Sequence, residues 1–407
     1  MLSHRSCIYL GVVLALIGCG SPAPIRQAGG TPYDSTNVEQ LSSGVVHRRL
    51  VANQGPFTIN VVEVDLHRKD IAIAAMRAFD SLRGRELTSA MVARRDAAGT
   101  AVIAAVNADF FNLKTGENEN NQVVDGVVVK GVPITDSPYD SLHTVHSQFG
   151  MTCDGHPVID RFVFAGSVLT PPPARAILPL DAVNFHPRKD ATVLYTAAYG
   201  VTPADSGGSL TVEVPLRIVA QRGDTIQLQP TGAPHAGGGT TIHSGDAVLA
   251  GSGASAEVIR RLAGSFGTTT QLRIVAGFTP RRGHLCTLVG GWPRLVIDGQ
   301  SIADSVDRIE GTFPGFSTTR HPRTGVGFSR DSSRLYLVTV DGRSESSSGM
   351  SLAEFASVMQ ALGVAQGLNL DGGGSTTLVL RGRVVNQPSD STGERKVGDA
   401  LLVTRKR

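Results

Sequence analysis

The chain has 407 residues, of which 41% are apolar and 18% are charged, a composition that supports a large core and excludes wholesale disorder. Glycine is unusually frequent, with 47 copies and no collagen-like period, which favours a protein of strands and tight turns. The net charge is only +3 and both signs are spread along the chain, so nucleic acid is not an expected partner.

The N-terminus is typical of an export signal. A weakly basic start at Arg5 precedes the apolar run 8–17, which is too short to span a bilayer. The run ends in Leu-Ile-Gly-Cys19, which resembles a bacterial lipobox, with a plain secretory signal and a chance cysteine as the alternative. We expect residues 1–19 to be a lipoprotein signal peptide lipidated at Cys19 and residues 20–40 to be a flexible tether. The protein is then membrane-anchored outside the cytoplasm, on the periplasmic side or at the cell surface.

The cysteines and histidines do not indicate a metal site. Cys153 and Cys286 lie outside the signal, and in an oxidising compartment they either form a disulfide or remain separate buried thiols. They belong to no CxxC motif and have no neighbouring histidine pair. His143 and His146 lack ligand spacing and are interpreted as structural. We expect no metal and no other cofactor.

The first part of the predicted domain combines strands with one short helix. Alternating apolar residues over 56–75 predict strands, residues 86–98 predict a helix, and the apolar run 101–106 predicts a buried strand. Asn107 and Asp109 follow that strand directly. Polar residues at a strand end are candidates for binding a substrate.

Residues 150–290 are interpreted as a β-rich insertion, because short apolar runs alternate there with Pro, Gly, Asp and Asn. Within the insertion, Gly251, Gly253 and Ala256 spell the dinucleotide fingerprint G-x-G-x-x-A. The fingerprint also needs an acidic residue about 20 positions later, and none occurs there. We therefore interpret these residues as a turn before a short helix.

The segment 291–407 carries the densest motifs. A buried strand at 335–340 ends in Asp341-Gly-Arg343, and a capping box at Ser351 predicts the start of a helix. The next strand, 367–370, opens into a glycine-rich loop. A strand–helix–strand unit with polar residues at the strand ends is how α/β scaffolds place active sites.

These patterns predict an α+β fold for one domain over 41–407. We expect a mixed β-sheet core with packed helices and a β-rich inserted section.

The glycine-rich loop consists of Asp371, Gly372, Gly373, Gly374 and Ser375. Successive glycine amides can point N–H donors at an anion, and a carboxylate beside them can act as base or nucleophile. The alternative is a tight turn in which Asp371 only binds the amides of its own loop.

Four arginines surround this loop in the sequence, namely Arg320, Arg323, Arg343 and Arg395. Arginine recognises phosphate and carboxylate groups through its forked donors, so the cluster favours an anionic substrate. Isolated surface arginines are the alternative.

Several strings taken together resemble the phosphodiester glycosidase family. They are VNADFF at 106–111, GGWPRLVIDG at 290–299, the motifs R-T-x-x-G, V-D-G-R and N-L-D-G-G-G-S within 323–375, and the string from 386 to 403. The likeness begins near residue 55 and is densest over 290–403. Ala108 and Asp109 depart from the family pattern, in which these positions are commonly glycine, and Gly398 departs from it at a position often held by Ala.

The resemblance implies a hydrolase that cleaves the glycosidic C–O bond of a sugar-1-phosphodiester, such as a GlcNAc-1-phosphodiester, and releases a phosphomonoester. Because this leaving group is already good, an arginine clamp can take the place of the usual acid, while one carboxylate is still needed near the anomeric carbon. We expect Asp371 to be that carboxylate. The other assigned residues are Arg323 and Arg343 for the phosphate, Asn107, Asp109 and Asp341 for the sugar, Glu394 as second-choice carboxylate, and Arg395 as a further phosphate or structural partner.

Two other functions fit the same residues. One is a non-catalytic lipoprotein that binds an envelope glycan or anionic polymer, and the other is a phosphodiesterase that cleaves the P–O bond. The expected partners are a sugar phosphate or envelope glycan, and a membrane through the lipid anchor.

Overall fold

The computed structural model describes residues 33–52, 55–135, 137, 140–142, 144–172, 175–203, 211–263 and 270–405. Cys19, most of the expected tether and His143 lie outside these described residues. The first strand, β1 (Asp34–Ser42), begins inside the range that the sequence assigns to the tether. No helix in the described ranges is long and apolar enough to cross a membrane.

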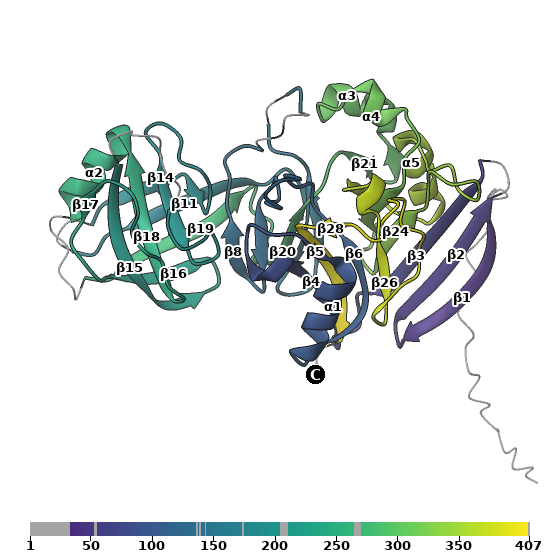
Figure 1. Cartoon of the computed structure of the whole chain (residues 1–407), viewed down its shortest axis with the longest axis horizontal. Helices are drawn as coiled ribbons and strands as arrows, with labels where there is room; N and C mark the ends of the chain where they lie inside the picture. The colour runs from purple at the N-terminus through teal and green to yellow at the C-terminus, as the bar shows by residue number, and fades with distance from the viewer. Residues whose placement is uncertain are drawn as a thin grey trace, which may run out of the picture. The chain divides into compact units, whose positions relative to one another are not determined.

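The predicted α+β class is wrong, because strands dominate the described chain and its helices are few and short (Figure 1). The helices are α1 (Thr88–Ala97), α2 (Gly253–Ala263), α3 (Val306–Ile309), α4 (Pro314–Ser317) and α5 (Leu352–Ala361). The strand pairs are antiparallel, with one short parallel pair, β13 with β14. The helices predicted at 86–98 and after Ser351 are present, but strands take up most of the remaining structured residues of the described chain.

The largest sheet outside residues 163–279 has eight strands. In spatial order they are β1 (Asp34–Ser42), β2 (Val45–Ala52), β3 (Phe57–Asp65), β24 (Arg334–Val340), β23 (Arg323–Phe328), β25 (Gln366–Leu370), β21 (Arg294–Ile297) and β22 (Gln300–Ser301). Helix α5 connects β24 to β25 and packs on β21 and β22. Its capping box is present as predicted, with Ser351 and Glu354 exchanging side chain-to-backbone hydrogen bonds.

Two five-stranded sheets and one two-stranded pair adjoin it. The first sheet has the order β27 (Arg383–Val384), β26 (Leu378–Leu380), β6 (Ala101–Asn107), β29 (Asp399–Arg405) and β4 (Ile71–Arg77). The second has the order β10 (Pro157–Asp160), β9 (Gln148–Thr152), β20 (Leu285–Gly290), β7 (Gln122–Val124) and β8 (Val127–Lys130). Strands β5 (Glu86–Leu87) and β28 (Lys396–Val397) form the pair. A shared apolar cluster joins all three larger sheets of this region.

Residues 163–279 form a separate nine-stranded sheet with α2, which we call the inserted module (Figure 1). Its strands are β11 (Val163–Leu169), β12 (Ile177–Leu180), β13 (Ala182–Val183), β14 (Thr192–Thr196), β15 (Thr211–Arg222), β16 (Thr225–Pro230), β17 (His235–Ala236), β18 (Asp246–Ser252) and β19 (Leu272–Thr279). The module is strand-rich, as the short apolar runs predicted, and has an apolar core largely of its own.

The strand β18 and helix α2 explain the G-x-G-x-x-A string. A Cβ atom at Gly251 would lie 2.6 Å from the Ile259 side chain, so this glycine lets the helix pack closely against its strand. At the start of α2, the Asp190 carboxylate accepts the N–H of Ala254 at 2.7 Å. A carboxylate of the protein therefore lies where a dinucleotide phosphate would bind.

Cys153 and Cys286 form a disulfide. The bridge joins the turn after β9 to β20, so it links the two chain segments that lead into and out of the inserted module. Of the two interpretations that the sequence left open, the structure shows the bond.

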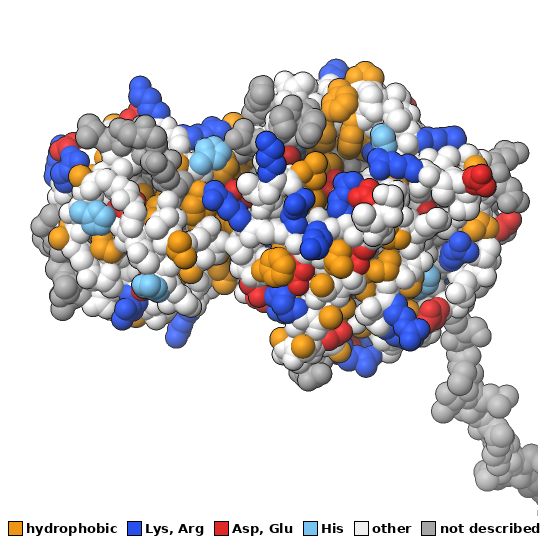
Figure 2. Space-filling model, in the orientation of Figure 1, with side chains coloured by type: hydrophobic (Ala, Val, Ile, Leu, Met, Phe, Trp, Pro, Cys, Tyr) orange, Lys and Arg blue, Asp and Glu red, His pale blue; other side chains and the backbone are white. Residues whose placement is uncertain are grey.

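Basic and acidic side chains are interspersed over the face of the molecule shown in Figure 2. The ion pairs agree with this mixing: Arg68 pairs with Asp70, Arg95 with Asp125, and Arg320 with Glu354. An arginine paired with a carboxylate in this way is not free to bind an anion.

Candidate active site

Several strand ends meet at one edge of the eight-stranded sheet. Strands β24 and β25 run in the same direction with antiparallel β23 between them, so the ends of the first two lie beside the start of the third. This places Asp341–Arg343, Asp371–Ser375 and Arg323 at one edge, as the strand-end patterns predicted.

Asn107, at the end of β6, connects this edge to the neighbouring sheet. Its amide nitrogen donates to the Asp371 carbonyl at 2.6 Å, and its amide oxygen accepts the Thr324 hydroxyl at 2.9 Å. The same oxygen accepts the N–H of Thr377 at 3.1 Å. Asn107 is fully buried and uses its side chain on the protein itself. It therefore shapes the glycine-rich loop, and its predicted contact with a sugar stays a prediction.

Asp371 is held at the start of the loop by its N–H, which donates to the Ala108 carbonyl at 2.9 Å. Burial raises the pKa of the Asp371 carboxyl to about 6, and the nearby Asp109 carboxyl acts in the same direction. The Ser375 hydroxyl and the Arg395 guanidinium oppose the rise by favouring the ionised form. The group is thus mostly ionised at neutral pH and close to the range in which it can accept a proton.

The glycines of the loop are required by close packing. A Cβ at Gly372 would lie 2.7 Å from the Pro322 carbonyl, and one at Gly374 would lie 2.1 Å from the Arg395 guanidinium. The amides of Gly373, Ser375 and Thr376 donate to backbone carbonyls. These three N–H groups are therefore already used, and anion recognition falls mainly to side chains beside the loop.

Arg343 is the exposed guanidinium at this loop, and its backbone has a positive φ of 60°. One of its nitrogens lies 3.1 Å from the position of a Cβ on Gly373. The other contacts are weak: 3.4 Å to the Ser389 hydroxyl and 3.5 Å to Nδ1 of His321. Burial and two neighbouring arginines lower the pKa of His321. An anion placed between Arg343 and Ser389 would meet a charged donor without breaking an ion pair.

Two of the other predicted phosphate ligands are already engaged. Arg323 is buried, and its guanidinium donates to the carbonyls of Met350, Phe316 and Thr319 at 2.8–3.0 Å. Burial lowers its pKa to about 10. Arg395 forms a two-pronged ion pair with Asp390 at 2.7 and 2.9 Å. The structure does not bring Arg323 to the open side of the loop, and Arg395 faces Gly374 with its partner.

The carboxylates of Glu394 and Asp341 hold backbone segments. Glu394 accepts the N–H and the hydroxyl of Ser89 at 2.9 and 2.5 Å, at the start of α1, where a negative charge offsets the helix dipole. Asp341 accepts the N–H of Gln387 at 3.1 Å, and burial raises its pKa to about 6. Asp341 thereby positions the segment that carries Ser389.

A second group of acids, absent from the sequence prediction apart from Asp109, lies behind Asp371. Asp109 is buried and accepts hydrogen bonds from the side chains of Asn118 and Asn120 at 3.1 and 2.7 Å. Its N–H donates to the Asp399 carboxylate at 2.8 Å. Burial raises the pKa of Asp109, Asp399 and Glu119, the last to about 8. We call Asp109, Glu119, Asp371 and Asp399 the acid cluster.

The sequence offered one signal for this cluster, the run GENENNQ at 116–122, which mixes acids and amides. It lies in a loop, where no periodicity shows which side chains point inward. Asp399 also depends on the pairing of β29 with β6, which joins residues nearly 300 positions apart.

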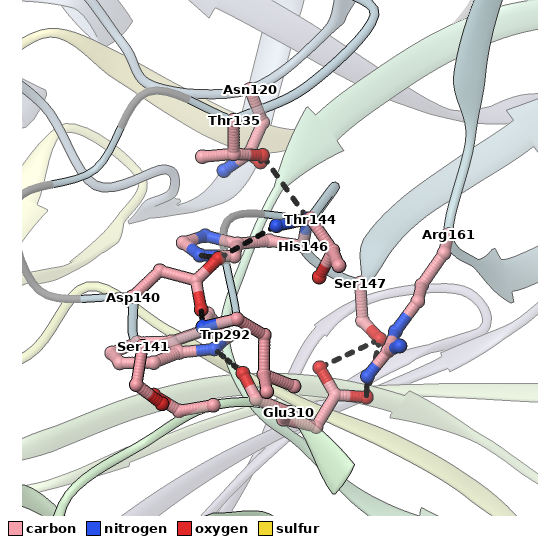
Figure 3. Close-up of polar contacts among 12 residues, drawn as sticks. Asn120, Thr135, Asp140, Ser141, Thr144, His146, Ser147, Arg161, Trp292 and Glu310 are labelled. Atoms are coloured by element: carbon pink, nitrogen blue, oxygen red, sulfur yellow. Dashed lines mark hydrogen bonds and ion pairs between the residues drawn. The ribbon is translucent and has the colours of Figure 1, made fainter.

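A hydrogen-bonded chain supports Asn120 from behind (Figure 3). The Thr135 hydroxyl donates to the Asn120 side chain at 2.7 Å and accepts the N–H of His146 at 3.1 Å. His146 is buried beside Asp140 at 3.3 Å and stacks on Trp292 with ring centroids 4.9 Å apart. Trp292 stacks in turn on Phe316 at 5.1 Å. This support makes the orientation of Asn120, and through it Asp109, rigid.

The comparisons with known proteins agree with the motif-based resemblance. Residues 216–404 match the model of the phosphodiester glycosidase family. The mouse (Mus musculus) N-acetylglucosamine-1-phosphodiester alpha-N-acetylglucosaminidase is 37% identical over 93 residues, which is 23% of this chain and 18% of that protein. The SPbeta prophage-derived uncharacterized protein YomE of Bacillus subtilis is 38% identical over 85 residues, which is 21% of this chain and 13% of that protein.

The chain spans less than a fifth of the length of these two curated relatives. A solved structure of a hypothetical protein from Synechocystis is similar with a TM-score of 0.67 and 20% identity, covering 93% of this chain and 64% of that one. At this identity the likeness shows the fold. The family resemblance drawn from the motifs is confirmed.

Proposed function

Given a chain that resembles the phosphodiester glycosidase family and matches its model over residues 216–404, we propose that this protein hydrolyses the glycosidic C–O bond of a sugar-1-phosphodiester. The products are the free sugar and a phosphomonoester. A GlcNAc-1-phosphodiester is the first substrate to test, because the mouse relative is named for that chemistry.

One observation carries the proposal. Asp371, a carboxyl with a pKa near 6, begins the glycine-rich loop, and Arg343, a guanidinium without an ion-pair partner among the described residues, lies beside Gly373 of that loop. The first can assist the attack of water on the anomeric carbon, and the second can hold the negatively charged phosphate that departs. The two groups match the two requirements of this hydrolysis.

The remaining site residues position these two groups. Asn107 holds the backbone of Asp371, and Asp341 holds the segment that carries Ser389. Arg323 fixes the loops around residues 316, 319 and 350 from inside. Pre-organised support of this kind keeps the reacting groups in place when the substrate binds.

We also propose that the protein acts outside the cytoplasm, as a lipoprotein anchored through Cys19. The lipobox-like string and the Cys153–Cys286 disulfide support this location, because disulfides persist in oxidising compartments. Labelling with a radioactive fatty acid in a bacterial host, compared between the natural chain and Cys19→Ala, tests the anchor.

The activity is tested by incubating the full chain with sugar-1-phosphodiesters that differ in the sugar and measuring the free sugar. The reaction run in ¹⁸O-labelled water locates the cleaved bond: label in the sugar supports C–O cleavage, and label in the phosphate identifies a P–O phosphodiesterase. Asp371→Asn is the inactive variant, and Asp246→Asn, in the inserted module, is the matched control. Binding of every substrate without turnover would contradict the proposal and favour a glycan-binding lipoprotein.

A further inference from the structure

Glu119 belongs to the acid cluster, and the proposed function gives it no role. Its two neighbours in the chain, Asn118 and Asn120, both donate side-chain hydrogen bonds to Asp109. The N–H of Glu119 itself donates to the Phe110 carbonyl at 2.9 Å. Three consecutive residues are thus fastened to the segment 109–110, and Glu119 is held at a fixed place beside it.

Asp371 is fastened to the same short segment. Its N–H donates to the carbonyl of Ala108, the residue before Asp109. The backbones that carry Glu119 and Asp371 are therefore tied to residues 108–110 from two sides. Glycoside hydrolysis uses a pair of carboxyls that flank the scissile bond.

The charges around Glu119 favour its protonated form. The Asp109 and Asp371 carboxyls interact with it electrostatically as like charges, and Lys130 interacts with it as a cation. Lys130 is buried and already binds the Asn118 carbonyl and the Glu117 carboxylate, the latter at 3.0 Å. Burial and the two acids raise the pKa of Glu119 to about 8, while the Ser137 hydroxyl and Lys130 act against the rise. Asp371 ionises near 6, so near pH 7 one carboxyl of the pair keeps its proton and the other has lost it.

We propose that Glu119 is the proton donor of this site and Asp371 its base, an inference that rests on the proposed function. As the bond between the anomeric carbon and the phosphate oxygen breaks, the proton of Glu119 passes to that oxygen. The oxygen of a water molecule bonds to the anomeric carbon, and a proton of this water passes to Asp371. The products are sugar and phosphomonoester, and exchange with solvent restores both carboxyls.

The assignment also narrows the substrate class. A phosphomonoester has its second pKa near 6, so departure without proton transfer expels a dianion, and a proton donor lets it leave as the monoanion. The alcohol stays on the phosphate and hardly changes this pKa, so a site with its own acid serves phosphodiesters of simple alkyl alcohols, which carry no activating group. Arg343 then orients the phosphate, and Glu119 neutralises the oxygen that leaves.

The test compares Glu119→Gln with the natural chain and with Glu117→Gln as a matched control. Glu117 lies two residues away and forms ion pairs with Lys130 and Arg83, so its variant reports on structural damage to the same loop. For the natural chain, kcat/KM should rise through about pH 6 as Asp371 ionises and fall through about pH 8 as Glu119 loses its proton. In Glu119→Gln the fall above about pH 8 should vanish, with kcat lowered about 10²–10⁴-fold, whereas Glu117→Gln should keep both limbs.

An unchanged pH profile in Glu119→Gln, with the natural chain active, would overturn the role of Glu119 and leave the proposed function standing. An inactive natural chain would contradict the proposed function. A second measurement then decides on Glu119: the side-chain ¹³C signal lost in Glu119→Gln reports its ionisation directly. Titration of this signal near pH 4 would overturn the inference, and titration near pH 8 would support it.

Discussion

The inserted module and the rest of the described chain are both built mainly from antiparallel strands, but they differ in the side chains that they bury. The module has an apolar core, and its buried Glu213 is matched by the N–H and hydroxyl of Thr240. Outside the module five carboxyls have raised pKa values, and these are all the raised carboxyls of the described chain: Asp109, Glu119, Asp341, Asp371 and Asp399.

This difference separates architecture from chemistry. A buried carboxylate without a cation costs folding free energy, so a fold accumulates such groups only where they serve another purpose. The module is the larger sheet, and its one buried carboxylate within the described strands, that of Glu213, is hydrogen-bonded by Thr240. This difference supports the proposal that the chemistry takes place at the strand ends around Asp371.

The largest expected effect comes from Asp371→Asn. Loss of the base should lower kcat by about 10³-fold or more. The same change removes a carboxylate whose burial is unfavourable, so the free energy of unfolding at pH 7 should stay equal or rise, by up to about 2 kcal/mol. Turnover assays and urea denaturation on the same preparation check both parts. A variant that loses activity and stability together would mean that Asp371 is part of the support.

Two arginines of the same edge should behave in opposite ways. Arg343→Ala should raise KM about 10–100-fold, the cost of one charge-assisted contact to phosphate, with the melting temperature unchanged. Arg323→Ala should lower the free energy of unfolding by about 3 kcal/mol, because removing the buried guanidinium leaves the three carbonyls that it binds unpaired. Equal losses of stability in the two variants would contradict the separation of phosphate contact from support.

Removing the disulfide should lower the stability of the protein and leave the activity of the candidate site nearly unchanged. The bridge closes a segment of 133 residues, so the double change Cys153→Ser and Cys286→Ser should lower stability by about 2–4 kcal/mol. The bridge lies at the opposite end of β20 from Gly290, which packs beside Asp109. We expect kcat/KM for a small phosphodiester to stay within about twofold of the natural value. A large loss in the folded variant would show that the two regions are coupled.

The buried carboxyls also make stability depend on pH. A carboxyl whose pKa is higher in the folded than in the unfolded chain contributes stability below its unfolded value, and this is lost as the pH rises through the folded value. For Asp341 and Asp371 that window lies between about pH 4 and pH 6, and for Glu119 it extends to about pH 8. From about pH 5 to about pH 8 the free energy of unfolding should therefore fall by about 1 kcal/mol for each of Asp341 and Asp371 and by more for Glu119, so the fall is smaller in Glu119→Gln. Denaturation curves at the two pH values measure it.

The sequence predicted the positions of those candidate site residues that directly follow an apolar run. Asn107, Asp341, Arg343 and Asp371 all come directly after apolar runs, and the structure brings them to one edge as the strand ends predicted. The capping box at Ser351 was also correct, since a cap is a property of four neighbouring residues.

The rest depended on contacts between distant segments. Arg323 looks from the sequence like an anion ligand, and only the positions of residues 316, 319 and 350 show that it is used internally. Glu394 faces α1, more than 300 residues earlier, and Glu119 lies in a loop without periodicity. The α+β prediction was wrong for a related reason: two- to seven-residue strands leave weak patterns and are defined by their partners.

The pairing of β11 with β19 has a consequence for how such a molecule can be rebuilt. The first residue of β11, Val163, lies opposite the last residue of β19, Thr279. Opposed residues in an antiparallel pair are about 5 Å apart, a gap that a tight turn can close. The chain therefore enters and leaves the module at neighbouring positions, while further contacts, such as that of Asn184 with the Val129 carbonyl, hold the module to the rest of the chain. A sheet of another size could join Val163 to Thr279 in place of the module, and the strands that carry Asp371 and its neighbours would keep their register.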